Sequence, residues 1–110
     1  MTGNQYQFAA LRTAGEKSYR DLLINGVMGL NGEAGECIDI VKKHLFQGHD
    51  LDKEKLMKEL GDCAWYLAIT AYSIGYMLDD VLSANIEKLK QRYPEGFDVE
   101  KSLHRAEGDT

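Results

Sequence analysis

Two pairs of acidic residues have the spacing of a metal site. Glu33 and Glu36 form the first pair, Glu59 and Asp62 form the second, and each pair encloses a glycine. Because an α-helix turns by about 100° per residue, the two acids of each pair lie on one face of a helix. Carboxylates that gather at one point repel one another unless a cation lies between them. The spacing therefore predicts a cation site that takes its ligands from two helices.

The residue types at this site select the kind of ion and the kind of reaction. All four candidate ligands are carboxylates, and no histidine accompanies them at a ligand spacing. Oxygen ligands favour hard cations, so we expect Mg²⁺, with Mn²⁺ as a substitute. Mg²⁺ in proteins is often shared with substrate phosphates, which makes phosphate chemistry the predicted use of the site. A ferritin-like di-iron centre would need Glu-x-x-His in two helices, and acids follow Glu33 and Glu59 instead.

Two basic residues and an asparagine share one sector of the predicted helix over residues 78–93. Asn85, Lys88 and Arg92 lie along one edge of this helix, beside an apolar stripe. A single basic residue in such a position is usually a solvated charge. An amide, an ammonium group and a guanidinium group in a row can instead bind a chain of phosphates. We therefore expect this row to contact the phosphates of a substrate.

Helices must position all of these groups, because the sequence offers little from which to build a strand. It contains one proline, at position 94, and no alternating run of β-branched residues. We expect residues 1–110 to form a single domain, of which residues 98–110 are a weakly packed polar tail. The periodicity predicts an all-α fold with helices over residues 4–14, 19–46, 52–76 and 78–93, and a short helix over residues 100–105.

The two longest predicted helices carry the two acidic pairs. In each helix the acids border an apolar stripe, which argues against the alternative that they are surface charges paired with lysines. The short connection at residues 47–51 favours antiparallel packing of the two helices through these stripes. We expect this packing to bring the four acids to one pocket.

Four glycines, at positions 26, 29, 32 and 35, fall within the predicted helix over residues 19–46. Each weakens a helix by about 1 kcal/mol relative to alanine, so the run needs an explanation. Two explanations remain open. The helix has a kink or break near residues 26–32, or a neighbouring helix or ligand approaches the backbone closely beside Glu33 and Glu36.

Charge and composition argue against several classes of partner. The chain has 18 acidic and 13 basic residues and a formal net charge of -5, which disfavours binding to duplex nucleic acid. Its longest apolar-rich stretch, residues 64–78, is too short to span a bilayer, so we expect no membrane partner. Cys37 and Cys63 lack the spacing of a metal or redox motif and fit a reducing compartment. We expect a cytoplasmic protein.

Size and aromatic residues indicate that subunits associate. A chain of 110 residues is close to the size at which a partner subunit helps to bury apolar surface. Trp65, Tyr72 and Tyr76 share another face of the predicted helix over residues 52–76. We expect these aromatic residues to pack in a subunit interface, with stacking on a nucleotide base as the alternative.

Three segments resemble the MazG-like family of all-α nucleoside triphosphate pyrophosphohydrolases. They are GLNGEAGE at residues 29–36, KELGDCAWYL at residues 58–67 and NIEKLKQRYPEGF at residues 85–97. The ExxE and ExxD pairs and the N-x-x-K-L-x-x-R-Y-P segment are fairly specific as a set, and the resemblance runs over nearly the whole chain. It implies a four-to-five-helix bundle that assembles as a homo-oligomer, either a dimer or a dimer-built tetramer.

The resemblance also implies an activity and roles for individual residues. Family members cleave nucleoside triphosphates between the α- and β-phosphates and release a monophosphate and pyrophosphate, which suits house-cleaning of the nucleotide pool. The chain is much shorter than the two-domain members, so their stress-response role is not carried over. The implied metal-binding and catalytic residues are Glu33, Glu36, Glu59 and Asp62. The implied substrate-binding residues are Asn85 and Lys88, to which we add Arg92 and, from the carboxylate sector, Lys43.

Two questions stay open at the level of the residues. Either Glu36 or Glu33 is suited to accept the proton of an attacking water. A non-catalytic helical oligomer that only binds nucleotides, or serves as a scaffold, would keep the same pocket. Release of pyrophosphate separates that protein from an enzyme.

Overall fold

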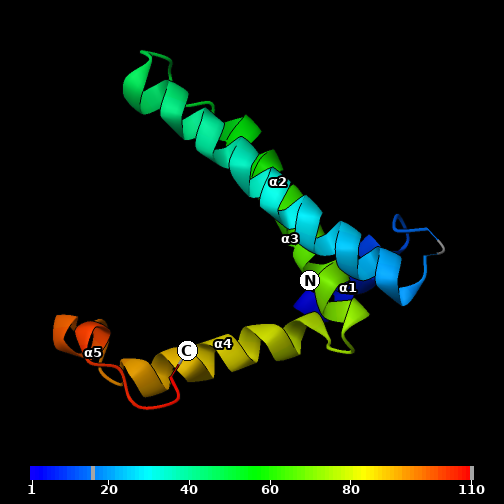
Figure 1. Ribbon diagram of the computed structural model, residues 1–110. Helices are drawn as coiled ribbons and strands as arrows, with labels where there is room; N and C mark the ends of the chain where they lie inside the picture. The colour runs from blue at the N-terminus through cyan, green and yellow to red at the C-terminus, as the bar shows by residue number, and fades with distance from the viewer. Residues whose placement is uncertain (16, 110) are drawn as a thin grey trace. The chain divides into compact units, whose positions relative to one another are not determined.

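The regular elements in the described part of the chain are all helices (Figure 1). The computed structural model describes residues 1–15 and 17–109. Its helices are α1 (Gly3–Leu11), α2 (Tyr19–Phe46), α3 (Lys53–Ser73), α4 (Leu78–Arg92) and α5 (Val99–Leu103). The all-α prediction is confirmed, and α2 has the predicted ends.

Local interactions set the ends of α3. Its first turn is capped by Asp52, whose side chain accepts a hydrogen bond of 3.0 Å from a backbone N–H. The helix ends at Ser73, short of the predicted residue 76. Gly75 has a φ of 87°, and the N–H of Tyr76 bonds back to the carbonyl of Ala71 at 2.9 Å. This left-handed turn closes the helix early.

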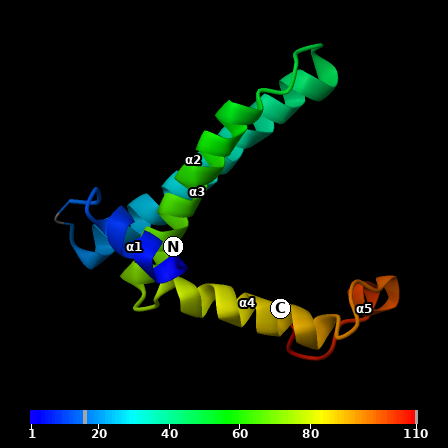
Figure 2. The ribbon, with the colours of Figure 1, turned by 180° about the vertical axis from the view of Figure 1, so that it is seen from behind.

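Backbone contacts divide the chain into two units, Met1–Leu78 and Asp79–Thr110. The expectation of a single domain stays a prediction. In the first unit, α2 and α3 lie side by side as an antiparallel hairpin, as Figure 1 and Figure 2 both show. Helix α1 packs against α3. The core of this unit consists of Ala14, Leu22 and Ile69, with Leu11 and Trp65 packed against it.

Two of the four glycines in α2 explain how closely the hairpin packs. The helix runs unbroken from Tyr19 to Phe46, so a break in it is excluded. A Cβ atom at Gly26 would overlap the side chain of Thr70, and one at Gly29 would overlap the ring of Tyr66. Close approach of α3 is therefore the reason for glycine at these two positions. No atom of the described chain approaches positions 32 and 35 in this way.

A buried glutamine joins α1 to the end of α3. The side chain of Gln7 is fully buried, and its Nε2 donates to the carbonyl of Ala68 at 3.0 Å and to that of Tyr76 at 3.2 Å. Its Oε1 accepts from the backbone N–H of Leu78 at 2.9 Å. Gln7 thus satisfies three backbone groups where α3 ends and α4 begins.

The second unit contains α4, α5 and the segment that follows. Asp98 caps α5 by accepting a hydrogen bond of 2.8 Å from the backbone N–H of Glu100. The segment after α5 turns back to α4, where Asp109 forms an ion pair of 2.7 Å with Arg92. The predicted polar tail is therefore anchored more firmly than expected, because an ion pair was not foreseen there.

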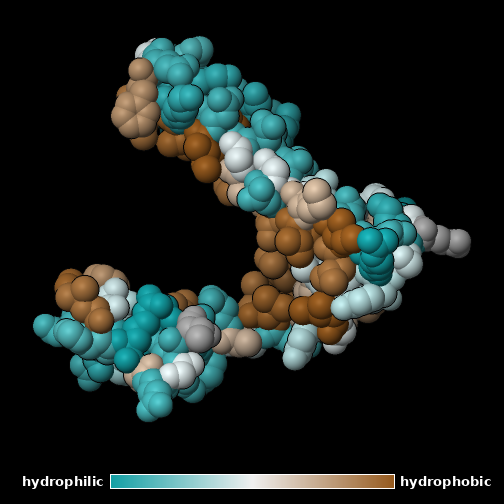
Figure 3. Space-filling view, in the orientation of Figure 1, coloured by the Kyte–Doolittle hydropathy of each residue, from teal (hydrophilic) through white to brown (hydrophobic). Residues whose placement is uncertain are grey.

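The apolar stripes of α2 and α3 are only partly covered within one chain. Ile38 and Leu45 of α2 are 68% and 62% exposed, and Leu60 of α3 is 57% exposed. Figure 3 shows brown, hydrophobic surface over this unit. The stripes thus leave apolar area that the hairpin itself does not bury. No helix of the described residues combines the length and the apolar character needed to cross a membrane.

Candidate metal centre

The hairpin of α2 and α3 brings three of the four predicted metal ligands to one point. Glu33 on α2 and Glu59 and Asp62 on α3 each offer a carboxylate oxygen, and these oxygens lie within 4.8 Å of one another. Glu33 and Glu59 are partly buried, whereas Asp62 is exposed. An ion among the three oxygens would be accessible from one side, as a metal that is shared with a substrate must be.

Two observations indicate that these carboxylates fit a cation. Atom Oε2 of Glu59 is buried and has no hydrogen-bond partner among the residues described, which is costly unless a ligand completes the site. In addition, a hydrogen bond shared with Glu59, partial burial and the charges of nearby acids raise the pKa of Glu33 from 4.5 to about 7. A proton therefore relieves, in the metal-free protein, part of the repulsion that a divalent cation would neutralise.

The fourth predicted ligand, Glu36, is exposed on α2, three positions beyond Glu33. Its charge contributes to the raised pKa of Glu33, so it lies near the other acids. Its carboxylate does not belong to the group whose oxygens lie within 4.8 Å of one another. The role of Glu36 as a ligand or catalytic group stays a prediction.

Tyr6 of α1 reaches the second acidic pair, which the sequence did not reveal. Its hydroxyl donates to the carbonyl oxygen of Gly61 over a long distance of 3.5 Å. Burial and, second, the charge of Asp62 raise the pKa of Tyr6. The two residues of this contact are 55 positions apart, so no local spacing could have signalled it.

A cavity of about 340 Å³ opens beside the carboxylates. It is lined by Glu33 and Asp62 together with Trp65 and Tyr66, whose rings meet edge to face with their centroids 5.0 Å apart. The indole Nε1 of Trp65 donates to the hydroxyl of Thr13 at 2.8 Å. Trp65 is thus held by its own chain beside the acidic group. The subunit interface predicted for Trp65, Tyr72 and Tyr76 stays a prediction.

The two cysteines are free and partly buried. Burial and, next, the neighbouring Cys37 raise the pKa of the Cys63 thiol, which keeps it protonated and unreactive at neutral pH. Neither cysteine belongs to the acidic group.

Lys43 lies away from the acidic group of its own chain. It forms an ion pair of 3.0 Å with Asp39 on the surface of α2. Lys43 is ten residues beyond Glu33 in the same helix, which corresponds to about 15 Å along the axis. Its contact with a substrate phosphate stays a prediction.

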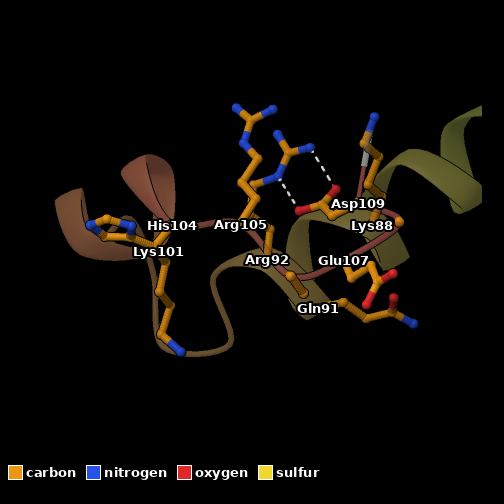
Figure 4. Close-up of a pocket in the computed structure, with 10 residues that line it drawn as sticks. Lys88, Gln91, Arg92, Lys101, His104, Arg105, Glu107 and Asp109 are labelled. Atoms are coloured by element: carbon orange, nitrogen blue, oxygen red, sulfur yellow. Dashed lines mark hydrogen bonds and ion pairs between the residues drawn. The ribbon is translucent and has the colours of Figure 1, made fainter.

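The three predicted phosphate-binding residues of α4 belong to the second unit. Asn85 is exposed, whereas Lys88 and Arg92 line a cavity of about 460 Å³ that the segment after α5 helps to form (Figure 4). Arg92 donates two hydrogen bonds, of 2.8 and 2.7 Å, to the carboxylate of Asp109. The contact of these residues with phosphates stays a prediction. No pattern in the sequence pointed to Asp109 as a partner of Arg92.

Comparison with known proteins adds a family assignment to this geometry. Residues 25–97 match the family described as "MazG nucleotide pyrophosphohydrolase domain", a range that includes the four acids and the whole of α4 with its basic residues. The gene 37 protein of Mycobacterium phage L5 is 36% identical over 100 residues, which cover 83% of this chain and 88% of that protein. No solved structure matches the chain significantly.

Proposed function

The chain belongs to the MazG nucleotide pyrophosphohydrolase family, and from this premise we propose that it hydrolyses nucleoside or deoxynucleoside triphosphates between the α- and β-phosphates. The products would be a nucleoside monophosphate and pyrophosphate, and house-cleaning of the nucleotide pool is the proposed purpose. The observation that carries the proposal is the meeting of Glu33, Glu59 and Asp62 within 4.8 Å. Hard oxygen ligands of this kind serve metal-assisted phosphate chemistry.

Magnesium is the proposed cofactor, with manganese as a substitute. Glu33, Glu59 and Asp62 would hold the ion. The buried Oε2 of Glu59, which has no hydrogen-bond partner among the described residues, supports this assignment. Exposed Glu36 is the proposed fourth acid of the site. When bound, the metal supplies Lewis acidity to phosphate oxygens and lowers the pKa of a bound water.

Glu36 is the better candidate for the proton acceptor. A carboxylate that binds a divalent cation loses basicity, because the positive charge favours its ionised form. Glu33 belongs to the close group of three, whereas Glu36 is exposed beside it. Glu36 can therefore keep the basicity needed to accept a proton from an attacking water.

Basic residues would hold the phosphate chain of the nucleotide. The proposed contacts are Asn85, Lys88 and Arg92 of α4, because an amide and two cations in a row can bind successive phosphates. Lys43 is a further candidate. Its ion pair with Asp39 is about half exposed and thus weak enough to exchange for a phosphate.

The uncovered apolar stripes support the proposal that the chain forms a dimer or a dimer-built tetramer. Ile38, Leu45 and Leu60 expose more than half of their surface in the single chain. Monomeric proteins seldom leave a contiguous apolar surface of this kind in water. Sedimentation equilibrium at micromolar concentration should give a mass above 12.4 kDa, and the mass of one chain would contradict the proposal.

A panel of nucleoside and deoxynucleoside triphosphates, with product identification, tests the proposed activity. We expect pyrophosphate and a monophosphate to appear in equal amounts when Mg²⁺ is present, and neither to appear after the metal is removed. Release of orthophosphate in place of pyrophosphate would contradict the proposed bond cleavage. Binding of nucleotides without turnover would indicate the non-catalytic oligomer instead.

The raised pKa of Glu33 should make the metal-free protein less stable as the pH rises. The folded chain keeps a proton on Glu33 up to about pH 7, whereas the unfolded chain loses it near 4.5. The folded state therefore binds more protons within this window, and stability falls as the pH increases through it. Urea unfolding in metal-free buffer should show this decline in the free energy of unfolding.

Two comparisons assign this decline to the acidic group. Glu33→Gln should show a smaller decline, because its side chain does not titrate. Mg²⁺ should also reduce the decline in the wild type, since the cation takes the place of the proton. An equal decline in wild type and variant would contradict the assignment.

A further inference from the structure

The cavity of the second unit has a positive lining in a chain that is negative overall. Its volume is about 460 Å³, and four of its lining residues carry a permanent positive charge: Lys88, Arg92, Lys101 and Arg105. Two acids, Glu107 and Asp109, also line it, so the cavity has a net positive charge while the chain has a formal charge of -5. Such a lining favours an anionic occupant.

One anionic group already lies among these cations. Asp109 accepts hydrogen bonds of 2.8 and 2.7 Å from Nε and Nη2 of Arg92. The side chains of the pair are only 15% and 11% exposed, so they cover one another from water. In Figure 4 the two side chains face one another, with Arg105 and Lys88 drawn on either side.

The surroundings of the Asp109 carboxylate match those of a bound phosphate. A guanidinium group binds carboxylates and phosphates with the same two-pronged geometry, and here one such fork is filled. Arg92, and more weakly Arg105 and Lys88, hold the pKa of Asp109 below its usual range. Asp109 therefore stays charged at neutral pH, and an anion that binds Arg92 in the same way must displace it.

We propose that the Asp109 carboxylate competes with the phosphate chain of a nucleotide for Arg92, and that it must leave Arg92 before the cavity admits a diphosphate or triphosphate. The inference rests on the proposed function in one respect, namely that Arg92 and Lys88 bind substrate phosphates. It adds Arg105 to the phosphate-binding residues and regulation by the chain's own carboxylate to the site. The ligand class is a polyphosphate anion, either the substrate nucleotide or the product pyrophosphate.

Removing the charge of Asp109 should strengthen polyphosphate binding. In Asp109→Asn the side chain keeps its size but no longer competes as an anion, so inorganic pyrophosphate should bind about tenfold more tightly. Calorimetric titration of the full chain in metal-free buffer measures this affinity, first with pyrophosphate and then with a nucleoside triphosphate. A larger gain for the nucleotide identifies the substrate as the natural occupant, and a larger gain for pyrophosphate identifies the product.

Glu107→Gln is the matched control. It removes one negative charge from the same cavity lining but leaves the pair of Arg92 and Asp109 in place. Its affinity for pyrophosphate should rise by less than about twofold, as expected for an exposed charge in water. Equal gains in Asp109→Asn and Glu107→Gln would overturn the proposal, because they would reduce it to a general charge effect.

A double variant tests whether the competition takes place at Arg92. In Arg92→Lys the two-pronged contact is lost, so the further change Asp109→Asn should give little additional gain in affinity. A full tenfold gain in the Arg92→Lys background would overturn the proposal. The proposal would also fail if Asp109→Asn alone melted at a lower temperature but bound pyrophosphate with the affinity of the wild type. Because binding is measured without metal, the result does not depend on whether the chain hydrolyses nucleotides.

Discussion

Replacing Glu59 with glutamine should lower magnesium-dependent release of pyrophosphate by at least about 100-fold. Glu59 supplies a buried oxygen that has no hydrogen-bond partner among the described residues, and it belongs to the group of three with Glu33 and Asp62. Glutamine keeps the shape of the side chain but not its charge, so the ion should bind weakly. Turnover is measured by pyrophosphate release. Metal binding is measured by the quenching of Trp65 fluorescence by Mn²⁺, since this sole tryptophan lines the cavity beside the acids.

Glu54→Gln on the same helix is the control for this variant. Glu54 is exposed and paired with Lys58 at 3.4 Å, and a surface pair contributes only about 0–1 kcal/mol. Its turnover should match that of the wild type. Without metal, Glu59→Gln should be no less stable than the wild type, because one of three repelling carboxylates is neutralised. Full turnover of Glu59→Gln would remove Glu59 from the catalytic group.

Replacing Gln7 with leucine should destabilise the fold by about 3 kcal/mol. The substitution keeps the volume of a fully buried side chain but removes its hydrogen bonds to Tyr76 and Leu78. The backbone groups of these two residues would then lack a partner in the place where α3 ends. The free energy of unfolding in urea, followed by Trp65 fluorescence, measures the loss.

Gln5→Leu is the matched control in the same helix. Gln5 is exposed and accepts a single hydrogen bond of 2.7 Å from the backbone N–H of Thr2, as part of the cap of α1. Its loss should cost about 1 kcal/mol or less. An equal loss of unfolding free energy in Gln7→Leu and Gln5→Leu would show that the hydrogen bonds of the Gln7 side chain do not hold α1 to the end of α3.

The elements that follow from local chemistry could be predicted from the sequence. The pattern of the sequence located the five helices. The convergence of Glu33 with Glu59 and Asp62 was predictable too, because a short connection leaves two long helices little choice but to pack antiparallel. The end of α3 was placed too far along, since the left-handed turn at Gly75 outweighs the apolar pattern that continues through it.

Contacts between distant parts of the chain could not be predicted in this way. Tyr6 reaches Gly61 across 55 positions and Gln7 reaches Leu78 across 71, and neither pairing leaves a periodic pattern. The pair of Arg92 and Asp109 escaped notice because an acid in a polar tail has no distinguishing spacing. The apolar stripes did not locate the closest packing of the hairpin, because Ile38, Leu45 and Leu60 stay exposed while Gly26 and Gly29 meet α3. A stripe does not say whether its own chain or another subunit covers it.

The absence of side chains at Gly26 and Gly29 has a consequence for how this protein tolerates change. Alanine is the residue that helices favour most, yet at these two positions the helix gives up about 1 kcal/mol each by carrying glycine. Glycine allows a shorter distance between α2 and α3, because Thr70 and Tyr66 occupy the space that methyl groups would fill. A variant with alanine at positions 26 and 29 would have a more stable α2 in isolation. It would also hold Glu33 farther from Glu59 and Asp62.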